Sequence, residues 1–109
     1  MTLQHIVLFA FAQDLDDDQA REMREQIEAW PAEIGGIDAL RFGSDLTGAR
    51  TRGHQYLLYM EFAGLVELQA YQQHPVHQRF LAWVLDHDCT PLAFDYHLTA
   101  ETVILPPPA

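Results

Sequence analysis

The chain has 109 residues, which fits one domain, and 49% of them are hydrophobic, enough to build a buried core. Its 16 acidic and 6 basic residues give a formal net charge of −10, which repels a phosphate backbone, so no nucleic acid partner is expected. No apolar run approaches the roughly 20 residues of a membrane span, so we expect no membrane association. The sequence opens without the pattern of a signal peptide, and the single Cys89 cannot form an internal disulfide. Both features lead us to expect a cytoplasmic protein.

The sequence opens with a predicted strand and a long predicted helix. Apolar residues indicate a strand over residues 3–11 that is buried on both faces. One face carries His5, Val7 and Phe9, and the other carries Ile6 and Leu8. The carboxylates of residues 14–18 then cap an amphipathic helix over residues 16–34, whose apolar face includes Met23 and Ile27. The acidic run lacks the glycine and the distal glutamate of a calcium loop, so we expect no metal site there.

Two further strands occupy the middle of the chain. Gly35 and Gly36 end the helix, and a strand is predicted over residues 37–45. A polar, glycine-containing connection leads to a second strand over residues 54–62. This strand places Tyr56, Leu58 and Met60 on one face and Leu57 and Tyr59 on the other, so it too is expected to be covered on both sides.

The last part of the chain is predicted to hold a helix in two pieces and a final strand. The first piece runs from Gly64 to Gln73, and the second runs from Pro75 to about residue 88. A strand over residues 90–98 follows. Residues 99–109 end in three prolines and are expected to form an extended tail, which either crosses a partner or trails into solvent.

The order βαββαβ predicts an α+β, ferredoxin-like domain over residues 1–98, with a four-stranded antiparallel sheet and helices on one face. The uncovered face would carry Ile6, Leu8, Leu57 and Tyr59. An apolar sheet face of this extent is usually an interface, so the sequence predicts a homodimer that pairs through it.

Residues able to move protons gather in the segment Tyr71-Gln72-Gln73-His74-Pro75-Val76-His77. Proline is favoured at the first helical position, which places His77 in the first turn of a helix. The positive end of the helix dipole disfavours an imidazolium there, so His77 should be neutral and able to accept a proton. With the phenol of Tyr71 nearby, the pattern suggests acid–base chemistry.

These features resemble the stress-responsive dimeric α/β-barrel (Dabb) family over residues 3–97. The resemblance is carried by residues 5–9, the turn at residues 43–45, Tyr71 with residues 74–77, and residues 94–96. It implies a dimeric barrel. Within the family the chain is similar to a plant polyketide cyclase, although the same architecture also hosts oxygenases and isomerases.

The resemblance to the cyclase also implies functional positions. Residues matching Tyr71 and His77 are catalytic in that enzyme, and the residue matching His5 lies in its pocket. Positions matching Val7, Phe9, Met23 and Ile27 help to line the pocket, one cyclase histidine falls on Tyr56 here, and Phe80 would pack beside them. Met23 and Ile27 stand where that enzyme has a phenylalanine and a tyrosine in its first helix.

The resulting hypothesis is proton abstraction next to a carbonyl, followed by aldol or Claisen-type ring closure or isomerisation, with neither metal nor organic cofactor. His77 would be the base, Tyr71 would donate to the developing oxyanion, and Asp95 would orient His77. Three alternatives stay open: a stress-responsive protein that only binds a small apolar ligand, a cofactor-independent oxygenase, and a dimeric scaffold with a filled core. In the scaffold, His77, Tyr71 and His5 would be structural, and His74 would only cap a helix.

Overall fold

Seven helices and strands make up the computed structural model, which describes residues 2–106. They follow the predicted order, and no predicted boundary differs from the observed one by more than two residues. The elements are β1 Leu3–Phe11, α1 Asp17–Glu33, β2 Ala39–Ser44, β3 Tyr56–Phe62, α2 Leu65–Gln73, α3 Pro75–Asp86 and β4 Cys89–His97. Within residues 2–106 no helix is long and apolar enough to cross a membrane.

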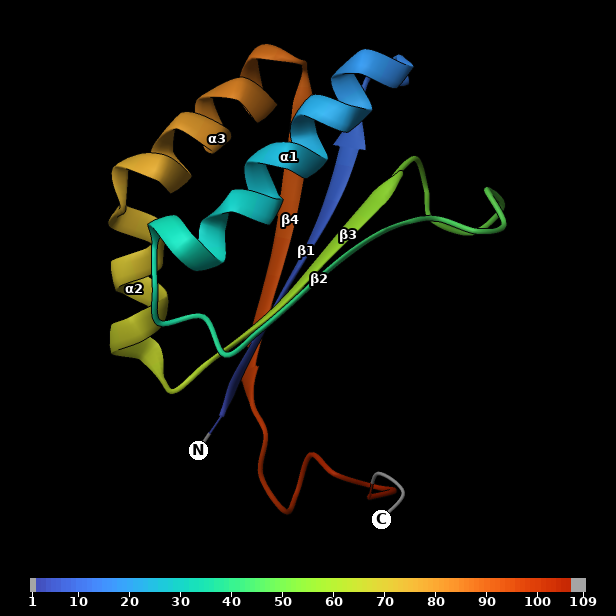
Figure 1. Cartoon of the computed structure of the whole chain (residues 1–109). Helices are drawn as coiled ribbons and strands as arrows, with labels where there is room; N and C mark the ends of the chain where they lie inside the picture. The colour runs from blue at the N-terminus through green and yellow to red at the C-terminus, as the bar shows by residue number, and fades with distance from the viewer. Residues whose placement is uncertain (1, 107–109) are drawn as a thin grey trace.

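The four strands form one antiparallel sheet in the order β2-β3-β1-β4. The helices all lie on one face of this sheet (Figure 1). The prediction of a ferredoxin-like α+β fold is therefore confirmed. Because β1 lies between β3 and β4, His5 is opposite Met60 on one side and opposite Asp95 on the other.

The acidic run after β1 begins α1 with a capping box. The Asp16 side chain accepts a hydrogen bond from the backbone N–H of Gln19 at 2.8 Å, and the Gln19 side-chain oxygen accepts one from the N–H of Asp16 at 3.0 Å. Asp17 and Asp18 lie in the first turn, where their charge is favourable beside the helix dipole. The run thus starts the helix, as the sequence predicts.

The junction between α2 and α3 is set by His74, which ends one helix and caps the next. Its backbone is extended, and its Nδ1 accepts a hydrogen bond from the Val76 N–H at 3.1 Å. Pro75 takes the first position of α3, where no intrahelical partner for an N–H is lost. The predicted helix start at Pro75 and the capping role of His74 are both observed.

The hydrophobic core fills the space between the sheet and the helices. Side chains of β1 and β3 alternate, so that every second residue is buried against the helical layer. The largest fully buried side chains are Trp30, Tyr71, Phe62, Leu3, Met23, Ile27, Leu58, Met60 and Val84. Burying each one contributes about 1.5–3 kcal/mol through removal of apolar surface from water.

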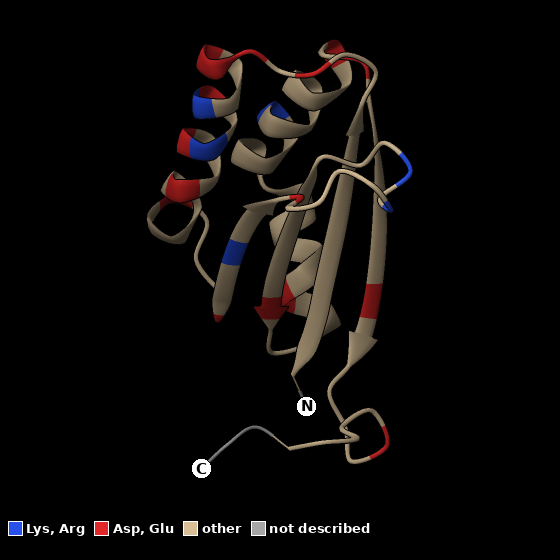
Figure 2. Cartoon of the chain, turned by 90° about the vertical axis from the view of Figure 1, so that its right-hand side faces the viewer, with Lys and Arg blue, Asp and Glu red and all other residues tan. Residues whose placement is uncertain are grey.

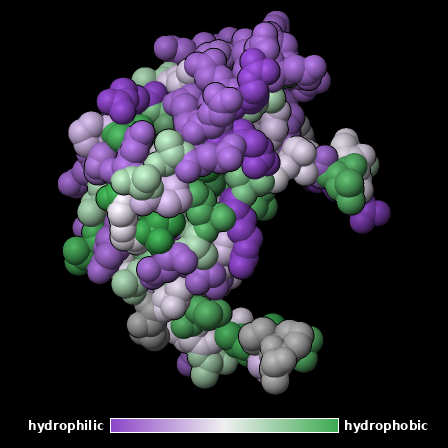
Figure 3. All heavy atoms as spheres, viewed as in Figure 1, coloured by the Kyte–Doolittle hydropathy of each residue, from purple (hydrophilic) through white to green (hydrophobic). Residues whose placement is uncertain are grey.

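The opposite face of the sheet stays open. Leu57, Leu92 and Phe94 are 40%, 56% and 66% exposed on it, and Ile6 and Leu8 are half-buried between them. Figure 2 looks onto this face, where most strand residues are neither acidic nor basic. Figure 3 shows that the same side of the molecule is hollowed between two projecting segments, the β2–β3 connection and the C-terminal tail. We call this surface the open face.

The tail does not begin as the extended segment that the sequence suggests. After β4 the chain makes a turn, in which the Thr102 N–H donates to the Thr99 carbonyl at 3.1 Å and the Thr102 hydroxyl accepts from the Thr99 N–H at 2.7 Å. Threonine hydroxyls favour such local bonds over extended backbone. Ile104 and Leu105 beyond the turn are exposed. The end of the tail, residues 107–109, lies outside the described residues.

Candidate functional site

A cavity of about 150 Å³ lies between the sheet and the helices α2 and α3. We call it the His77 cavity. Its lining comes from β1, β3, β4 and both helices, and consists of His5, Val7, Phe9, Leu58, Tyr71, Gln72, His77, Phe80, Leu81, Val84, Pro91 and Ala93. Eight of these twelve residues are apolar and none is acidic or an arginine. The cavity therefore suits an uncharged, largely apolar molecule.

Three side chains on different elements bring polar groups to this cavity: His5 from β1, Tyr71 from α2 and His77 from α3. The ring of Tyr71 lies 4.4 Å from that of His77 and 6.0 Å from that of His5, measured between centroids. The sequence-predicted pair thus lines one cavity together with the predicted pocket histidine. Two imidazoles and a phenol around one space can exchange protons with a bound molecule.

The basic nitrogen of His77 is defined by its backbone contact. Nδ1 lies 3.1 Å from the carbonyl oxygen of Gln72, which can only accept, so Nδ1 carries the hydrogen and Nε2 is left as the acceptor. Burial lowers the pKa of His77 because it disfavours the charged ring, and the positive charge of His5 lowers it further. The bond to Gln72 opposes this shift in part. His77 is thus held as a neutral base.

Tyr71 is held by aromatic contacts. Its ring lies 5.5 Å from Trp30 and 5.2 Å from Phe62 between centroids, and the residue is 2% exposed. Burial raises the pKa of the Tyr71 hydroxyl well above its ordinary value, which keeps it protonated at neutral pH. Burial is the cause of this shift, and within residues 2–106 no hydrogen bond contributes to it. The protonated hydroxyl can therefore donate to a bound oxygen atom.

His5 is paired with a carboxylate on the neighbouring strand. Asp95 lies directly opposite His5 in the β1–β4 register, and its Oδ1 is bonded to the His5 Nδ1. This corrects the expected role of Asp95 as the group that orients His77, because the residue across the ladder is His5 and His77 is held by a backbone carbonyl instead. The His5 side chain is 4% exposed, whereas that of Asp95 is 35% exposed.

The remaining predicted pocket residues separate into two groups. Val7, Phe9 and Phe80 line the His77 cavity. Met23 and Ile27 do not line it, because they are buried where α1 packs into the core. Tyr56 is also absent from this cavity: it is opposite Phe9 and stacks on Phe42, with a centroid distance of 5.5 Å.

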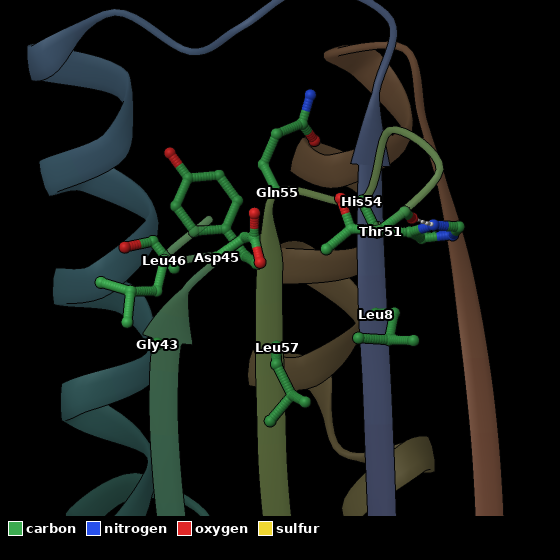
Figure 4. A pocket seen from close by; sticks show the side chains of 10 residues that line it. Leu8, Gly43, Asp45, Leu46, Thr51, His54, Gln55 and Leu57 are labelled. Carbon is green, nitrogen blue, oxygen red and sulfur yellow. Dashed lines mark hydrogen bonds between the residues drawn. The ribbon is translucent and has the colours of Figure 1, made fainter. Parts of the chain in front are cut away.

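Tyr56 instead borders a second, shallower cavity of about 260 Å³ under the β2–β3 connection, which we call the loop pocket. Figure 4 shows its lining side chains, with Leu8 and Leu57 on the strands and Leu46, Thr51 and His54 on the connection. Thr51 holds His54 through a 2.8 Å contact from its carbonyl oxygen to Nδ1. Because Leu8 and Leu57 belong to the open face, the loop pocket lies on the side of the sheet away from His77.

Sequence reasoning missed several residues of the His77 cavity, chiefly Gln72, Leu81, Val84, Pro91 and Ala93. A helical spacing could have found two of them, because Leu81 and Val84 follow His77 at four and seven residues on one face of α3. Pro91 and Ala93 alternate with Asp95 along β4, so they share its face. Within residues 2–106 no group of three or more His, Cys, Asp or Glu side chains is placed to hold a metal ion.

Solved structures with the same fold cover most of the chain. A dimeric protein of unknown function from Bacteroides fragilis is 26% identical, with a TM-score of 0.77 over 89% of this chain and 96% of that one. A dimeric ferredoxin-like protein of unknown function from Thermobifida fusca is also 26% identical, with a TM-score of 0.77 over 90% and 92%. The hydroxynitrile lyase of Passiflora edulis is 15% identical, with a TM-score of 0.79 over 91% and 94%.

Comparison with curated proteins gave no match. A family model does match, and it covers residues 3–98, nearly the same range as the sequence resemblance described above. The fold agrees with this match, since the sheet and both helical segments around the His77 cavity fall inside the matched range. The chain belongs to the family described as the stress responsive A/B barrel domain, or Dabb.

Proposed function

We propose that this protein is a cofactor-free acid–base enzyme that removes a proton next to the carbonyl of a small, uncharged compound. The observation that carries the proposal is the placement of the Tyr71 and His77 rings, 4.4 Å apart on the wall of one apolar cavity. The neutral state of His77 and the protonated hydroxyl of Tyr71 supply a base and a hydrogen-bond donor. Aldol or Claisen-type ring closure and isomerisation all begin with this step.

The proposed step uses two atoms of the site. Nε2 of His77 takes the proton from the carbon next to the carbonyl, and the electrons of the broken C–H bond pass to the carbonyl oxygen. The Tyr71 hydroxyl donates a hydrogen bond to that oxygen as its negative charge develops. The enolate then attacks a second carbonyl, or takes a proton back at another position.

The size of the cavity limits the substrate. An apolar cavity of about 150 Å³ accepts a molecule of roughly the size of benzene, whereas drug-sized ligands use about 300–1,000 Å³. A ring closure like that of plant olivetolic acid cyclase belongs to the proposed chemistry. The volume favours a one-ring or short-chain ketone over a long polyketide chain. The absence of arginine from the lining and the net charge of −10 favour an uncharged compound.

A protein that only binds an apolar ligand is the second candidate. It is favoured by the eight apolar residues of the lining, which would hold a small hydrophobic molecule without any chemistry. In this case the contact of His77 with the Gln72 carbonyl would be purely structural.

We also infer that the protein works as a homodimer joined through the open face. Leu57 and Leu92 are exposed there on either side of Leu8 of β1, and Phe94 is exposed opposite Ile6, so the apolar side chains form one surface across three strands. The similar proteins from Bacteroides fragilis and Thermobifida fusca are described as dimeric. The His77 cavity lies on the other side of the sheet, so it stays accessible in such a dimer.

Hydrogen exchange tests the proposed function directly. Cyclohexanone, a neutral ketone of benzene size, is incubated with the protein in D₂O, and loss of its α-proton signals is followed by NMR. The wild-type protein should accelerate exchange over buffer, His77→Ala should return it to the buffer rate, and Tyr71→Phe should slow it about 100-fold or more. His87→Ala is the control, because His87 lies at the other end of α3 and does not line the cavity.

The same samples distinguish the alternatives. Chemical-shift changes of the protein on adding cyclohexanone, without exchange above buffer, would support the ligand-binding candidate and contradict the enzyme. Neither binding nor exchange would overturn both and leave a structural protein. Exchange that survives in His77→Ala would remove His77 as the base.

A further inference from the structure

The cavity holds a second histidine that the proposed step does not use. His5 faces His77 across the space, since His5 belongs to the sheet and His77 to the helical layer. Each imidazole is fixed through Nδ1 by an oxygen atom of the protein, Asp95 Oδ1 for His5 and the Gln72 carbonyl for His77. In both rings this leaves Nε2 as the nitrogen available to a bound molecule.

The two fixing oxygens differ in charge. The carbonyl of Gln72 is neutral and suits an uncharged His77, which burial also favours. The carboxylate of Asp95 can compensate a positive charge on the His5 ring, as the aspartate of a catalytic triad does for its histidine. A positive charge on His5 in turn disfavours a second charge on His77. The site therefore combines one imidazole held by a neutral carbonyl with one held by a carboxylate.

Among residues 2–106, Asp95 is the one charged group bonded to His5. The ring is in edge contact with Phe62 from β3 and with Tyr71 from α2, at centroid distances of 6.3 Å and 6.0 Å. The titratable groups that face it are Tyr71, which burial keeps protonated, His77 from α3 and Asp95 from β4. Asp95 is the acidic group among them, and it is the one bonded to the His5 ring.

Asp95 also connects the buried ring to solvent. β4 is an edge strand paired only with β1, and the Asp95 side chain is 35% exposed while that of His5 is 4% exposed. A proton can thus pass from solvent to the carboxylate, through the ring of His5 and out at Nε2.

We propose that His5 is a second catalytic residue of the His77 cavity, which donates a proton from Nε2 to the carbonyl oxygen of the substrate, and that Asp95 is its positioning residue. The inference rests on the proposed function. His77 takes the proton from carbon, the C–H electrons form the carbon–carbon double bond of an enol, and the proton of His5 forms the enol O–H bond. His77 leaves the step protonated and His5 neutral, so charge is conserved, and Tyr71 keeps its proton while it holds the oxygen.

The test compares substitutions at the two histidines in the cyclohexanone exchange assay. His5→Gln should slow exchange about 100-fold, because glutamine keeps a polar contact to Asp95 but cannot transfer a proton. Asp95→Asn should slow exchange about tenfold with the affinity for cyclohexanone unchanged within twofold, and Asp95→Glu should recover most of the rate. Asp86→Asn is the matched control, since Asp86 is an exposed carboxylate at the end of α3.

Chemical rescue separates proton transfer from packing. His5→Ala should regain exchange when imidazole is added, because free imidazole can enter the vacated space and donate the proton, whereas a packing role would not be restored in this way. Circular dichroism shows whether each variant is folded, and Asp95→Asn changes no buried apolar contact.

The outcomes for the two proposals are distinct. Wild-type exchange in His5→Gln, with exchange lost in His77→Ala, overturns the role of His5 and leaves the proposed function standing. Equal losses of affinity and rate in Asp95→Asn would also overturn the role proposed for His5 and Asp95, because they would indicate that Asp95 is only structural. If the wild-type protein gives no exchange above buffer, the proposed function fails and the role of His5 fails with it.

Discussion

The rings of Tyr71 and His77 lie 4.4 Å apart between centroids, with their planes inclined by 54°, although the two residues belong to different helices. In one continuous helix, residues six apart would point about 120° away from each other and lie roughly 9 Å apart along the axis. The break at His74 and Pro75 removes this separation. The helix junction is therefore what assembles the candidate site.

A first prediction concerns this junction. His74→Ala should lower the free energy of unfolding by about 1 kcal/mol, because the Val76 N–H loses its capping acceptor. It should also slow cyclohexanone exchange, because His77 lies in the turn that the cap fixes. Chemical denaturation and the exchange assay measure the two effects. His74→Asn should keep both properties close to wild type, since asparagine is a good N-cap, and a loss as large as that of alanine would contradict the capping argument.

The lowered pKa of His77 gives a second prediction. The ordinary pKa of histidine is 6.5. At pH values near and below it, the folded protein binds fewer protons at His77 than the unfolded chain does, because the pKa of His77 is lowered in the fold. The stability contributed by neutral His77 is thus complete above about pH 6.5, the pKa in the unfolded chain, and is lost as the pH falls from there through the lower pKa of the folded protein. Denaturation at pH 7.5 and pH 5.5 should show a larger loss in the wild type than in His77→Gln.

The same pKa should respond to His5. Because the charge of His5 lowers the pKa of His77, His5→Gln should raise it toward 6.5, as observed in an NMR titration of the His77 ring signals. Burial remains the larger cause, so the pKa should not exceed the ordinary value. An unchanged titration in His5→Gln would show that the two rings do not interact.

The sequence predicts the pairing of Tyr71 with His77 better than the rest of the site. A proline at a helix start is a local signal, so the junction is readable from adjacent residues. The partner of Asp95 cannot be read from adjacent residues, because it depends on the register between β1 and β4. The paired residues His5 and Asp95 are 90 positions apart in the sequence. A shift of two residues would keep Asp95 on the same face and give it another neighbour.

Tyr56, Met23 and Ile27 illustrate a different limit. Their apolar periodicity correctly predicts that they face the helix–sheet interior, but periodicity does not tell whether a buried position borders a cavity or a packed core. Tyr56 lies opposite Phe9, four residues along β1 from His5, which is about 13 Å. Met23 and Ile27 are packed under α1, while the cavity opens under α3.

A fourth prediction tests the dimer. Phe94→Asp should convert the protein from a two-chain to a one-chain species in light scattering, because it places a charge at an apolar position that the proposed interface buries. Val66→Asp is the matched control, since Val66 is 75% exposed on α2, away from the open face. Dissociation in both variants would point to a general effect of added negative charge, and dissociation in neither would contradict an interface at Phe94.

The size limit of the cavity gives a last prediction, which uses Ala93. This residue lies opposite Val7 on β4 and lines the cavity, so Ala93→Leu should fill part of its 150 Å³. Cyclohexanone should then bind at least tenfold more weakly, while acetone, which needs less room, should still exchange its protons. Stability should fall by no more than about 1–3 kcal/mol, the usual cost of added methylenes, because the cavity offers room for the side chain.

Ala82→Leu makes the same substitution at an exposed position of α3 outside the lining, and it should leave both ketones unaffected. The comparison is informative because the two variants add the same side chain, one to the cavity lining on β4 and one to an exposed position of α3 outside the lining. Equal binding of cyclohexanone by Ala93→Leu and the wild type would mean that the ketone occupies another place, such as the loop pocket, whose larger volume and distance from His77 allow binding without proton transfer. Selective loss of the larger ketone would instead locate binding, and with it the chemistry, between Ala93 and His77.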